Sequence, residues 1–469
     1  MPDATPERIS VAAVAALTVL ALAIRASQFD QSLFGDELYA LFEVQDRSFG
    51  NMLETVYEGP EVTPPLFFVL AWAAAKLGDP TIWLRLPSLV CGVLLVPATY
   101  VLGALTVGRR AGLAGAVVVT LAPFAIFYSV EARPYAMLAL LTVASTIALL
   151  RAVDRNAAGW WIAYGLASAA ALYTHLTAVF VLAAQAAWAV HAHRDRLRGL
   201  VLANAAAAAL LAVWLPRLFR DDLPALVGTY GPFSGRPGDL AGVLAHILPG
   251  LPFVPLDRLP GTVATVAFAA TLAALVAAGV ASRARLPAVL VAPAVAVPAG
   301  LIAYGAVTGD GLFTPRTATT MLPYAALLIG ALVVRLPCRA MPVAAALLFL
   351  SLAAGTLGAV GEDGQRPRYR EAAAYIAAQA RPGDEVLERE LFPNLGAWSP
   401  HFAIYVPPGL PYAREGEDEL GDPDRVFFVH VPVGRPAPAT LGDGLVPEAR
   451  RTFPGIHPVA VTTYVRRAP

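Results

Sequence analysis

The chain has 469 residues, of which 57% are hydrophobic and only 14% are charged. Soluble globular proteins carry about 25% charged residues, so this composition excludes an ordinary soluble protein, and its hydrophobicity excludes a disordered one. The 34 basic and 34 acidic residues give a formal net charge of zero, which argues against nucleic acid as a partner. Two cysteines, Cys91 and Cys338, are too few for a disulfide framework or a thiolate metal site. We therefore expect an integral protein of the lipid bilayer.

Eleven apolar stretches are candidates for membrane-spanning helices, which need about 20 residues each. They are 9–26, 83–107, 111–128, 135–151, 159–174, 176–192, 199–216, 262–281, 286–305, 318–335 and 340–358. The first follows Arg8 and shows no small-residue cleavage site, so we expect a retained anchor and not a signal peptide. A shorter apolar stretch, 65–77, is either a twelfth span or an interfacial helix.

The distribution of arginine favours the interfacial helix. If 65–77 does not cross, every second connection is short and basic: Arg109 with Arg110, Arg151 with Arg155, Arg194 with Arg196 and Arg198, Arg283 with Arg285, and Arg335 with Arg339. Positively charged connections remain in the cytoplasm. We therefore expect a multi-pass protein of the plasma membrane with about 11 spans, a cytoplasmic N-terminus and an extracytoplasmic C-terminus.

Three regions are then extracytoplasmic. The first loop, 27–82, contains amphipathic stretches such as 37–44 that suit a helix on the membrane surface. The loop 217–261 is rich in Gly and Pro, with a short apolar run at 240–248. Residues 361–469 are polar enough for a small α/β domain next to the transmembrane domain 1–360. Its expected elements are a helix from 369 to 376 and strands at 385–388, 402–406, 425–432 and 459–465.

Asp36 and Glu37 follow the first span directly, within Gly35-Asp36-Glu37. One interpretation is a helix start, because an aspartate caps a helix and an acidic residue in the first turn is favoured by the helix dipole. The other is a carboxylate at the rim of a membrane cavity that acts as a general base. The sequence leaves both open.

Glu131-Ala132-Arg133-Pro134-Tyr135 lies between two apolar spans with almost no loop around it. Ionisable residues at membrane depth are costly and are candidates for function by default. The alternative is an ion pair between Glu131 and Arg133 that merely fixes a tight turn. His175 lies at another outer turn, where it either bridges helices or contacts a ligand.

Arg85 and Arg316 stand at outer helix ends, against the general distribution of positive charge. Each either extends to lipid headgroups or holds an anionic group, since the guanidinium fork matches phosphate geometry. For Arg316 we favour the anionic ligand.

Taken together and in this order, several motifs resemble the polytopic C-type (GT-C) glycosyltransferases, especially bacterial members of glycosyltransferase family 39. They are Gly35-Asp36-Glu37, Thr63-Pro64-Pro65-Leu66-Phe67-Phe68, Glu131-Ala132-Arg133-Pro134-Tyr135, Pro315-Arg316 and the segment from Tyr369 to Asp384. That group includes protein O-mannosyltransferases. Its members often carry a histidine before the Pro-Pro pair, where this chain has Thr63, which leaves the roles of Thr63 and of neighbouring Glu61 open.

The resemblance implies a GT-C fold and a donor in which a sugar is attached to a polyprenyl phosphate. It also implies that Asp36 is the general base for an acceptor hydroxyl on a protein, a glycan or a lipid, with inversion at the sugar. Arg316 would stabilise the leaving phosphate, with Arg133 or His175 assisting, while Glu37 and Glu131 would orient the acceptor or the sugar. Tyr135 and Arg85 complete the expected substrate-binding set.

The resemblance leaves metal dependence as a choice between two patterns. Some oligosaccharide-transferring relatives hold a divalent cation with acids of the first two outer loops, and Asp36 and Glu131 would be the corresponding ligands. The mannosyltransferase-like members, which this chain resembles more, are thought to need no metal, so we expect none. Two other functional classes remain: a transporter or flippase for lipid-linked glycans, although no inverted repeat is visible, and a non-catalytic membrane scaffold.

Overall fold

A computed structural model describes residues 6–59, 63–219, 232–247, 262–389, 402–432, 435–442 and 444–466. They divide into two compact units. The helical unit comprises Met1–Phe29 and Glu43–Ala359, and the sheet unit comprises Asp30–Phe42 and Val360–Pro469. The segment 30–42 comes from the first predicted loop, yet it packs with the C-terminal residues.

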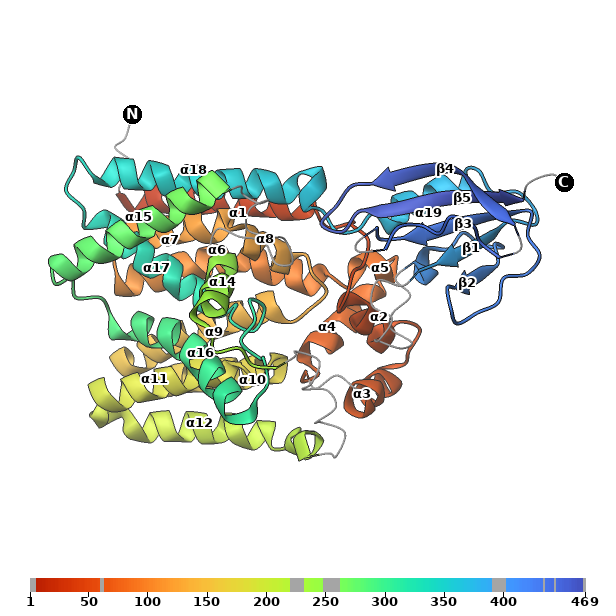
Figure 1. Ribbon diagram of the computed structural model, residues 1–469. Helices are drawn as coiled ribbons and strands as arrows, with labels where there is room; N and C mark the ends of the chain where they lie inside the picture. The colour runs from red at the N-terminus through yellow and green to blue at the C-terminus, as the bar shows by residue number, and fades with distance from the viewer. Residues whose placement is uncertain are drawn as a thin grey trace. The chain divides into compact units, whose positions relative to one another are not determined.

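All eleven predicted spans coincide with helices, and the third is broken in two (Figure 1). These helices are α1 (Pro6–Ala26), α6 (Leu86–Thr106), α7 (Arg109–Leu121) with α8 (Pro123–Ser129), α9 (Tyr135–Arg155), α10 (Ala158–Thr174), α11 (Ala178–Ala192), α12 (Leu197–Leu211), α15 (Thr262–Ala281), α16 (Ala288–Thr308), α17 (Met321–Val334) and α18 (Met341–Val360). Among the described residues, four helices are long and apolar enough to cross a bilayer, and the α7–α8 pair makes a fifth. Shorter apolar helices include α11 and α17.

Shorter helices fill the connections of the helical unit. They are α3 (Phe49–Glu58), α4 (Leu66–Ala75), α5 (Pro80–Trp83), α14 (Pro237–Ile247) and the 3-10 turns Arg194–Arg196 and Leu215–Phe219. The predicted amphipathic stretch 37–44 is α2 (Glu37–Val44), most of which belongs to the sheet unit. The ten residues of α4 rise only about 15 Å, half the thickness of the hydrocarbon layer, which is consistent with the interfacial helix expected at 65–77.

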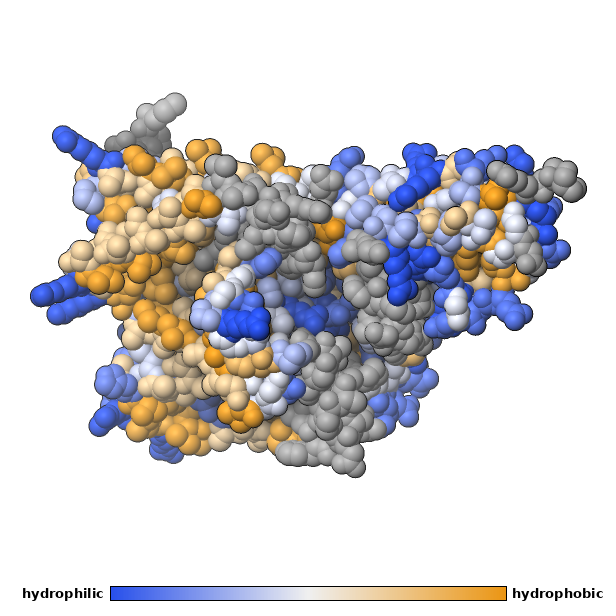
Figure 2. Space-filling model, in the orientation of Figure 1, coloured by the Kyte–Doolittle hydropathy of each residue, from blue (hydrophilic) through white to orange (hydrophobic). Residues whose placement is uncertain are grey.

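The surface of the helical unit agrees with a membrane environment. Figure 2 shows hydrophobic residues over much of its visible face, while the sheet unit carries many more hydrophilic ones. Large apolar side chains are exposed on several helices, including Ile162 on α10, Val307 on α16 and Leu357 on α18. In water such exposure would be costly, whereas lipid tails solvate these side chains. The prediction of a polytopic helical membrane protein with a C-terminal α/β domain is confirmed.

Close backbone packing joins α6, α7 and α17. A Cβ at Gly103 of α6 would lie 2.4 Å from the Cα of Gly112 on α7 and 2.6 Å from a methyl carbon of Leu327 on α17. No side chain fits there, which is the pattern of small residues at helix interfaces in membranes.

Buried polar groups also link α9, α11 and α17. The side-chain amide of Gln185 on α11 donates to Ser145 Oγ at 2.9 Å and Thr146 Oγ1 at 2.8 Å on α9. Tyr324 of α17 shares a 2.7 Å hydrogen bond with Thr146 and donates to the Thr142 carbonyl at 3.0 Å. Because lipid offers no hydrogen-bond partners, such groups hold the three helices in one register.

The sheet unit is a five-stranded mixed sheet with the order β2-β1-β3-β5-β4. Its strands are β1 (Glu385–Glu388), β2 (Tyr412–Arg414), β3 (Arg425–His430), β4 (Leu445–Phe453) and β5 (Val459–Arg466). The first three strands of this order run parallel to one another, whereas β5 is antiparallel to β3 and β4. Helix α19 (Tyr369–Ala377) packs with Val386, Phe427 and Val461 in one hydrophobic cluster. Leu387 and Phe428 belong to a second cluster. Neighbouring residues of β1 and β3 thus enter different clusters, as alternation in a strand requires.

The helix at 369–376 and the strands at 385–388, 425–432 and 459–465 are confirmed to within two residues. The strand predicted at 402–406 is wrong, because Ala403–Tyr405 forms a 3-10 turn whose preceding residue, Phe402, donates its N–H to the carboxylate of Glu388 at 3.0 Å. The sequence analysis missed β2 and β4. Six consecutive residues of β4 are exposed, so this edge strand shows no alternation of hydrophobic and polar residues.

Candidate functional site

The predicted base, Asp36, lies at the start of α2 in the sheet unit. Gly35 has φ +58°, a left-handed conformation that favours glycine, and its carbonyl accepts the N–H of Leu38 at 3.1 Å. Asp36 itself is half-buried, while the adjacent Glu37 is fully buried. The turn therefore gives two adjacent carboxylates different environments, and only Asp36 is partly exposed.

Glu37 forms a buried ion pair. Its Oε2 lies 3.2 Å from Arg366 Nε, and the two side chains are 0% and 2% exposed. The same oxygen accepts the N–H of Phe34 at 3.1 Å, as a glutamate does when it reaches back to the start of its own helix. Glu37 thus ties the beginning of α2 to the polar segment that precedes α19.

Further hydrogen bonds hold the segment 30–42 within the sheet unit. The N–H of Leu33 donates to the hydroxyl of Tyr405 at 2.6 Å. The N–H of Arg366 donates to Gln31 Oε1, and that of Arg370 to Ser32 Oγ, both at 3.0 Å. These bonds flank Asp36 on its N-terminal side, so the backbone that carries it is fixed to residues more than 300 positions later.

The Glu131–Tyr135 turn belongs to the helical unit. Glu131, Arg133 and Tyr135 are 6%, 5% and 1% exposed, and the carbonyl of Glu131 accepts the N–H of Arg133 at 2.7 Å. On α6, the hydroxyl of Ser88 donates to the Arg133 carbonyl at 2.9 Å. An acid and a base are therefore held in a tight, well-anchored turn inside the helical unit.

Tyr135 brings this turn together with His175. The two rings lie 5.8 Å apart, and Tyr135 also packs edge-on against Tyr128 at 5.0 Å. His175 ends α10 and is half-buried, and its Nδ1 lies 2.8 Å from Thr177 Oγ1 and accepts the Thr177 N–H at 3.3 Å. With Nδ1 accepting, the neutral ring carries its proton on Nε2.

The two arginines expected at outer helix ends lie in different surroundings. Arg85 is fully buried beside α6 and donates from Nη1 to the Phe29 carbonyl at 3.2 Å, just beyond the end of α1. Arg316 is half-buried in the turns before α17, where its carbonyl accepts the hydroxyl of Thr319. Arg316 is thus the more accessible of the two residues. The roles expected for both remain predictions, as do those of the other six site residues.

Thr63, which stands where relatives often have histidine, is buried at 4% exposure. Neighbouring Glu61 lies outside the described residues. Within the described ranges, no three His, Cys, Asp or Glu side chains are grouped so that they could hold a metal ion.

The carboxyl ends of the parallel strands hold two buried polar residues, Glu388 of β1 and His430 of β3. Glu388 accepts the N–H of Phe402, and His430 stacks on Phe428 with ring centroids 4.9 Å apart. Burial, with the nearby charge of Arg450, lowers the pKa of His430 to about 4, so the ring is neutral at pH 7. The hydrogen bond from Phe402 ties the segment that begins at residue 402 to the end of β1.

Two residues that the sequence analysis did not single out prove central to these arrangements. Arg366 neutralises Glu37 from 329 positions away, and no local pattern signals the pairing. Arg25, in the last turn of α1, is fully buried among main-chain carbonyls of the broken third span. The sequence did contain a signal for Arg25: a charged residue near the end of an apolar helix requires partners within the protein.

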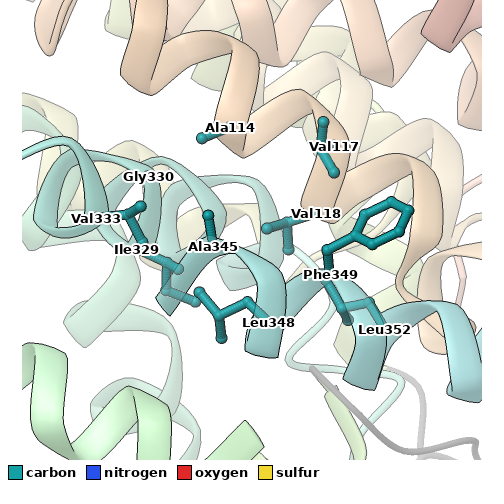
Figure 3. Close-up of a pocket in the computed structure, with 10 residues that line it drawn as sticks. All are labelled: Ala114, Val117, Val118, Ile329, Gly330, Val333, Ala345, Leu348, Phe349 and Leu352. Atoms are coloured by element: carbon teal, nitrogen blue, oxygen red, sulfur yellow. The ribbon is translucent and has the colours of Figure 1, made fainter. Parts of the chain in front are cut away.

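A cavity of about 220 Å³ between α7, α17 and α18 is unrelated to these polar residues. Figure 3 shows that Phe349, Leu348 and other apolar side chains line it. Without an ionisable group in its lining, it offers no chemistry for group transfer.

Known proteins resemble this chain in fold and in part of its sequence. The sequence profile of the dolichyl-phosphate-mannose-protein mannosyltransferase family matches residues 62–219. ArnT from Cupriavidus metallidurans in its apo state aligns over 96% of this chain and 97% of its own, with 14% identity and a TM-score of 0.58. The form of ArnT bound to undecaprenyl phosphate aligns over the same shares, with 15% identity and a TM-score of 0.58. No curated protein sequence matches the chain.

The alignment with ArnT includes nearly the whole of both chains, helical unit and sheet unit alike. The fold expected from the sequence motifs is thereby confirmed: the chain has the fold of the GT-C membrane glycosyltransferases.

Proposed function

We propose that the chain is a membrane glycosyltransferase that moves one sugar, mannose or another hexose or pentose, from a polyprenyl phosphate to an acceptor hydroxyl. The main support is the agreement of nearly the entire chain with a protein whose structure holds undecaprenyl phosphate. The family profile adds support, since its description names a sugar carried by a lipid phosphate. The acceptor is a protein, glycan or lipid outside the cytoplasm.

In the proposed reaction, Asp36 takes the proton of the acceptor hydroxyl while that oxygen attacks the anomeric carbon. The bond between the anomeric carbon and the phosphate oxygen breaks, polyprenyl phosphate leaves with the electron pair, and the configuration inverts. Half-burial of Asp36 at the start of α2 suits a base that must meet an incoming hydroxyl. Glu37, fixed by Arg366, orients α2 and so holds Asp36 in place.

The departing phosphate keeps its negative charge and needs fixed donors. Arg316 is the best candidate because it is the more accessible of the two outer arginines, with Arg133 and His175 assisting. Preorganised donors at developing charge contribute about 3–4 kcal/mol each to transition-state stabilisation. Glu131 and Tyr135 orient the sugar, and Arg85 supports the site through its bond to the end of α1.

The test is sugar transfer from defined polyprenyl-phosphate sugars in membranes that contain the wild type, Asp36→Asn or a control, Asp46→Asn. Asp46 is exposed and has φ +55°, which asparagine also tolerates, so its replacement controls for the loss of a nearby carboxylate. We expect transfer by the wild type and Asp46→Asn, and at least a 100-fold loss in Asp36→Asn, in line with general-base catalysis. Full transfer by a normally expressed Asp36→Asn protein would refute the assignment of the base.

We also propose the orientation expected from the arginine distribution, with the N-terminus in the cytoplasm and the C-terminal domain outside the plasma membrane. Reporter fusions after Arg155 and after residue 365 should then report opposite sides of the membrane. Reports from the same side would contradict the topology.

A further inference from the structure

The third span is interrupted between α7 and α8, which are bent by 63° at Ala122–Pro123. In a continuous helix the carbonyl of Val119 accepts the N–H of residue 123, but proline has no N–H to donate. The following carbonyls also lose their helical partners, because the backbone of Ala122 is extended. A bilayer offers no water to replace these bonds, so other groups of the protein must supply them.

Arg25 supplies two of the missing donors. Its Nη2 donates to the Val119 carbonyl at 3.0 Å, and its Nη1 to the Thr120 carbonyl at 3.3 Å. The hydroxyl of Thr356 on α18 donates to the third, the Leu121 carbonyl, at 2.6 Å. The positive guanidinium therefore lies at the C-terminal end of α7, where the helix dipole is negative and stabilises a cation.

The same guanidinium also reaches across the break. Arg25 Nε donates to Ser129 Oγ at 2.9 Å, at the end of α8, and that hydroxyl in turn donates to the Ala125 carbonyl. Gly92 of α6 supports Ser129 from another direction, since a Cβ at Gly92 would lie 2.0 Å from Ser129 Oγ. Ser129 is thus fixed by both α1 and α6, two residues before Glu131.

We propose that Arg25, acting through Ser129, is a positioning residue that sets the direction of α8 and thereby the placement of the Glu131–Tyr135 turn. An uninterrupted helix would need no buried arginine, and a charge at membrane depth is costly. In this chain the break at Ala122–Pro123 and the buried Arg25 both lie close to the Glu131–Tyr135 turn, which the end of α8 precedes directly. The inference rests on the proposed function only in so far as it concerns catalysis.

Two variants separate positioning from general stability. Ser129→Ala removes the link from Arg25 to α8 while the bonds of Arg25 to Val119 and Thr120 remain. Thr356→Val removes another bond at the same break, to the Leu121 carbonyl, but no bond to Ser129. Arg25→Lys keeps the charge but lacks the planar group of donors that reaches both α7 and Ser129 of α8. The folded fraction of this variant should therefore behave like Ser129→Ala.

The first readout is amide hydrogen exchange of the purified full chain in nanodiscs. We expect Ser129→Ala to accelerate exchange in residues 130–135 at least tenfold, while Thr356→Val leaves that segment as in the wild type. This readout does not depend on enzymatic activity. Unchanged exchange in Ser129→Ala would overturn the inference even if the proposed function failed.

The second readout is kinetic and uses the sugar-transfer assay per mole of folded protein. Misplacement of groups by about 1 Å costs on the order of 100-fold in rate, so kcat should fall 10- to 100-fold in Ser129→Ala with the donor KM changed less than threefold. Thr356→Val should retain the wild-type kcat. Equal losses of kcat in both variants, or none in Ser129→Ala, would contradict positioning. An inactive wild type would refute the proposed function, with the exchange result still deciding the inference.

Discussion

Removal of the Glu37 carboxylate should loosen the segment that carries Asp36. In Glu37→Gln the amide oxygen still accepts the N–H of Phe34, but Arg366 stays buried without the carboxylate that lies 3.2 Å from its Nε. Loss of one partner from a buried ion pair costs about 3–5 kcal/mol, and the retained hydrogen bond places this case near 3 kcal/mol. At 1.36 kcal/mol per tenfold change, the opening equilibrium of the segment should rise about 100-fold.

Hydrogen exchange of the peptide that spans 30–42 measures this opening directly. A double variant, Glu37→Gln with Arg366→Met, removes the buried charge as well and should recover part of the lost protection. Protection equal to the wild type in Glu37→Gln would refute the structural importance of the pair. If transfer falls while protection is unchanged, Glu37 contacts the substrates instead.

Three further outcomes follow from the fold. Gln185→Leu should destabilise the helical unit by about 0.5–1.5 kcal/mol in detergent unfolding, the range for interhelical hydrogen bonds in membranes, and no change would show that the amide is dispensable. Gly103→Ala should cost about 1–3 kcal/mol by overpacking against the Gly112 backbone and Leu327, whereas Gly159→Ala, where a Cβ has open space, should cost nothing in the same assay. The pKa of His430 is about 4 in the folded chain and 6.5 when the ring is exposed, so protons favour the unfolded form as the pH falls from 6.5 to 4. Hydrogen exchange of the sheet should show a loss of up to about 3 kcal/mol of stability over this range. His430→Phe should abolish the loss.

The sequence predicted the helical unit well because span length and apolar composition are local properties. The break at Pro123 escaped prediction, since residues 111–128 form one continuous apolar run. What makes the break tolerable is distant: Arg25 and Thr356 supply its hydrogen bonds from α1 and α18. Such compensation cannot be read from the segment itself.

The candidate site shows the same division between local and distant information. The motif around Asp36 predicted a helix start correctly, and α2 begins at Glu37. The pairing of Glu37 with Arg366, far along the chain, could not be read from that motif. Likewise, the contact of Tyr135 with His175 depends on the packing of α9 against α10, which sequence spacing does not reveal.

The lipid-linked sugars of a strain that lacks the chain provide the most direct test of the central claim. A transferase that consumes a polyprenyl-phosphate sugar leaves that donor unused when it is deleted, so the account predicts its accumulation. Expression of the wild type should return the donor to its normal level, and Asp36→Asn should not. Absence of any accumulated polyprenyl-phosphate sugar, or full restoration by Asp36→Asn, would contradict the account.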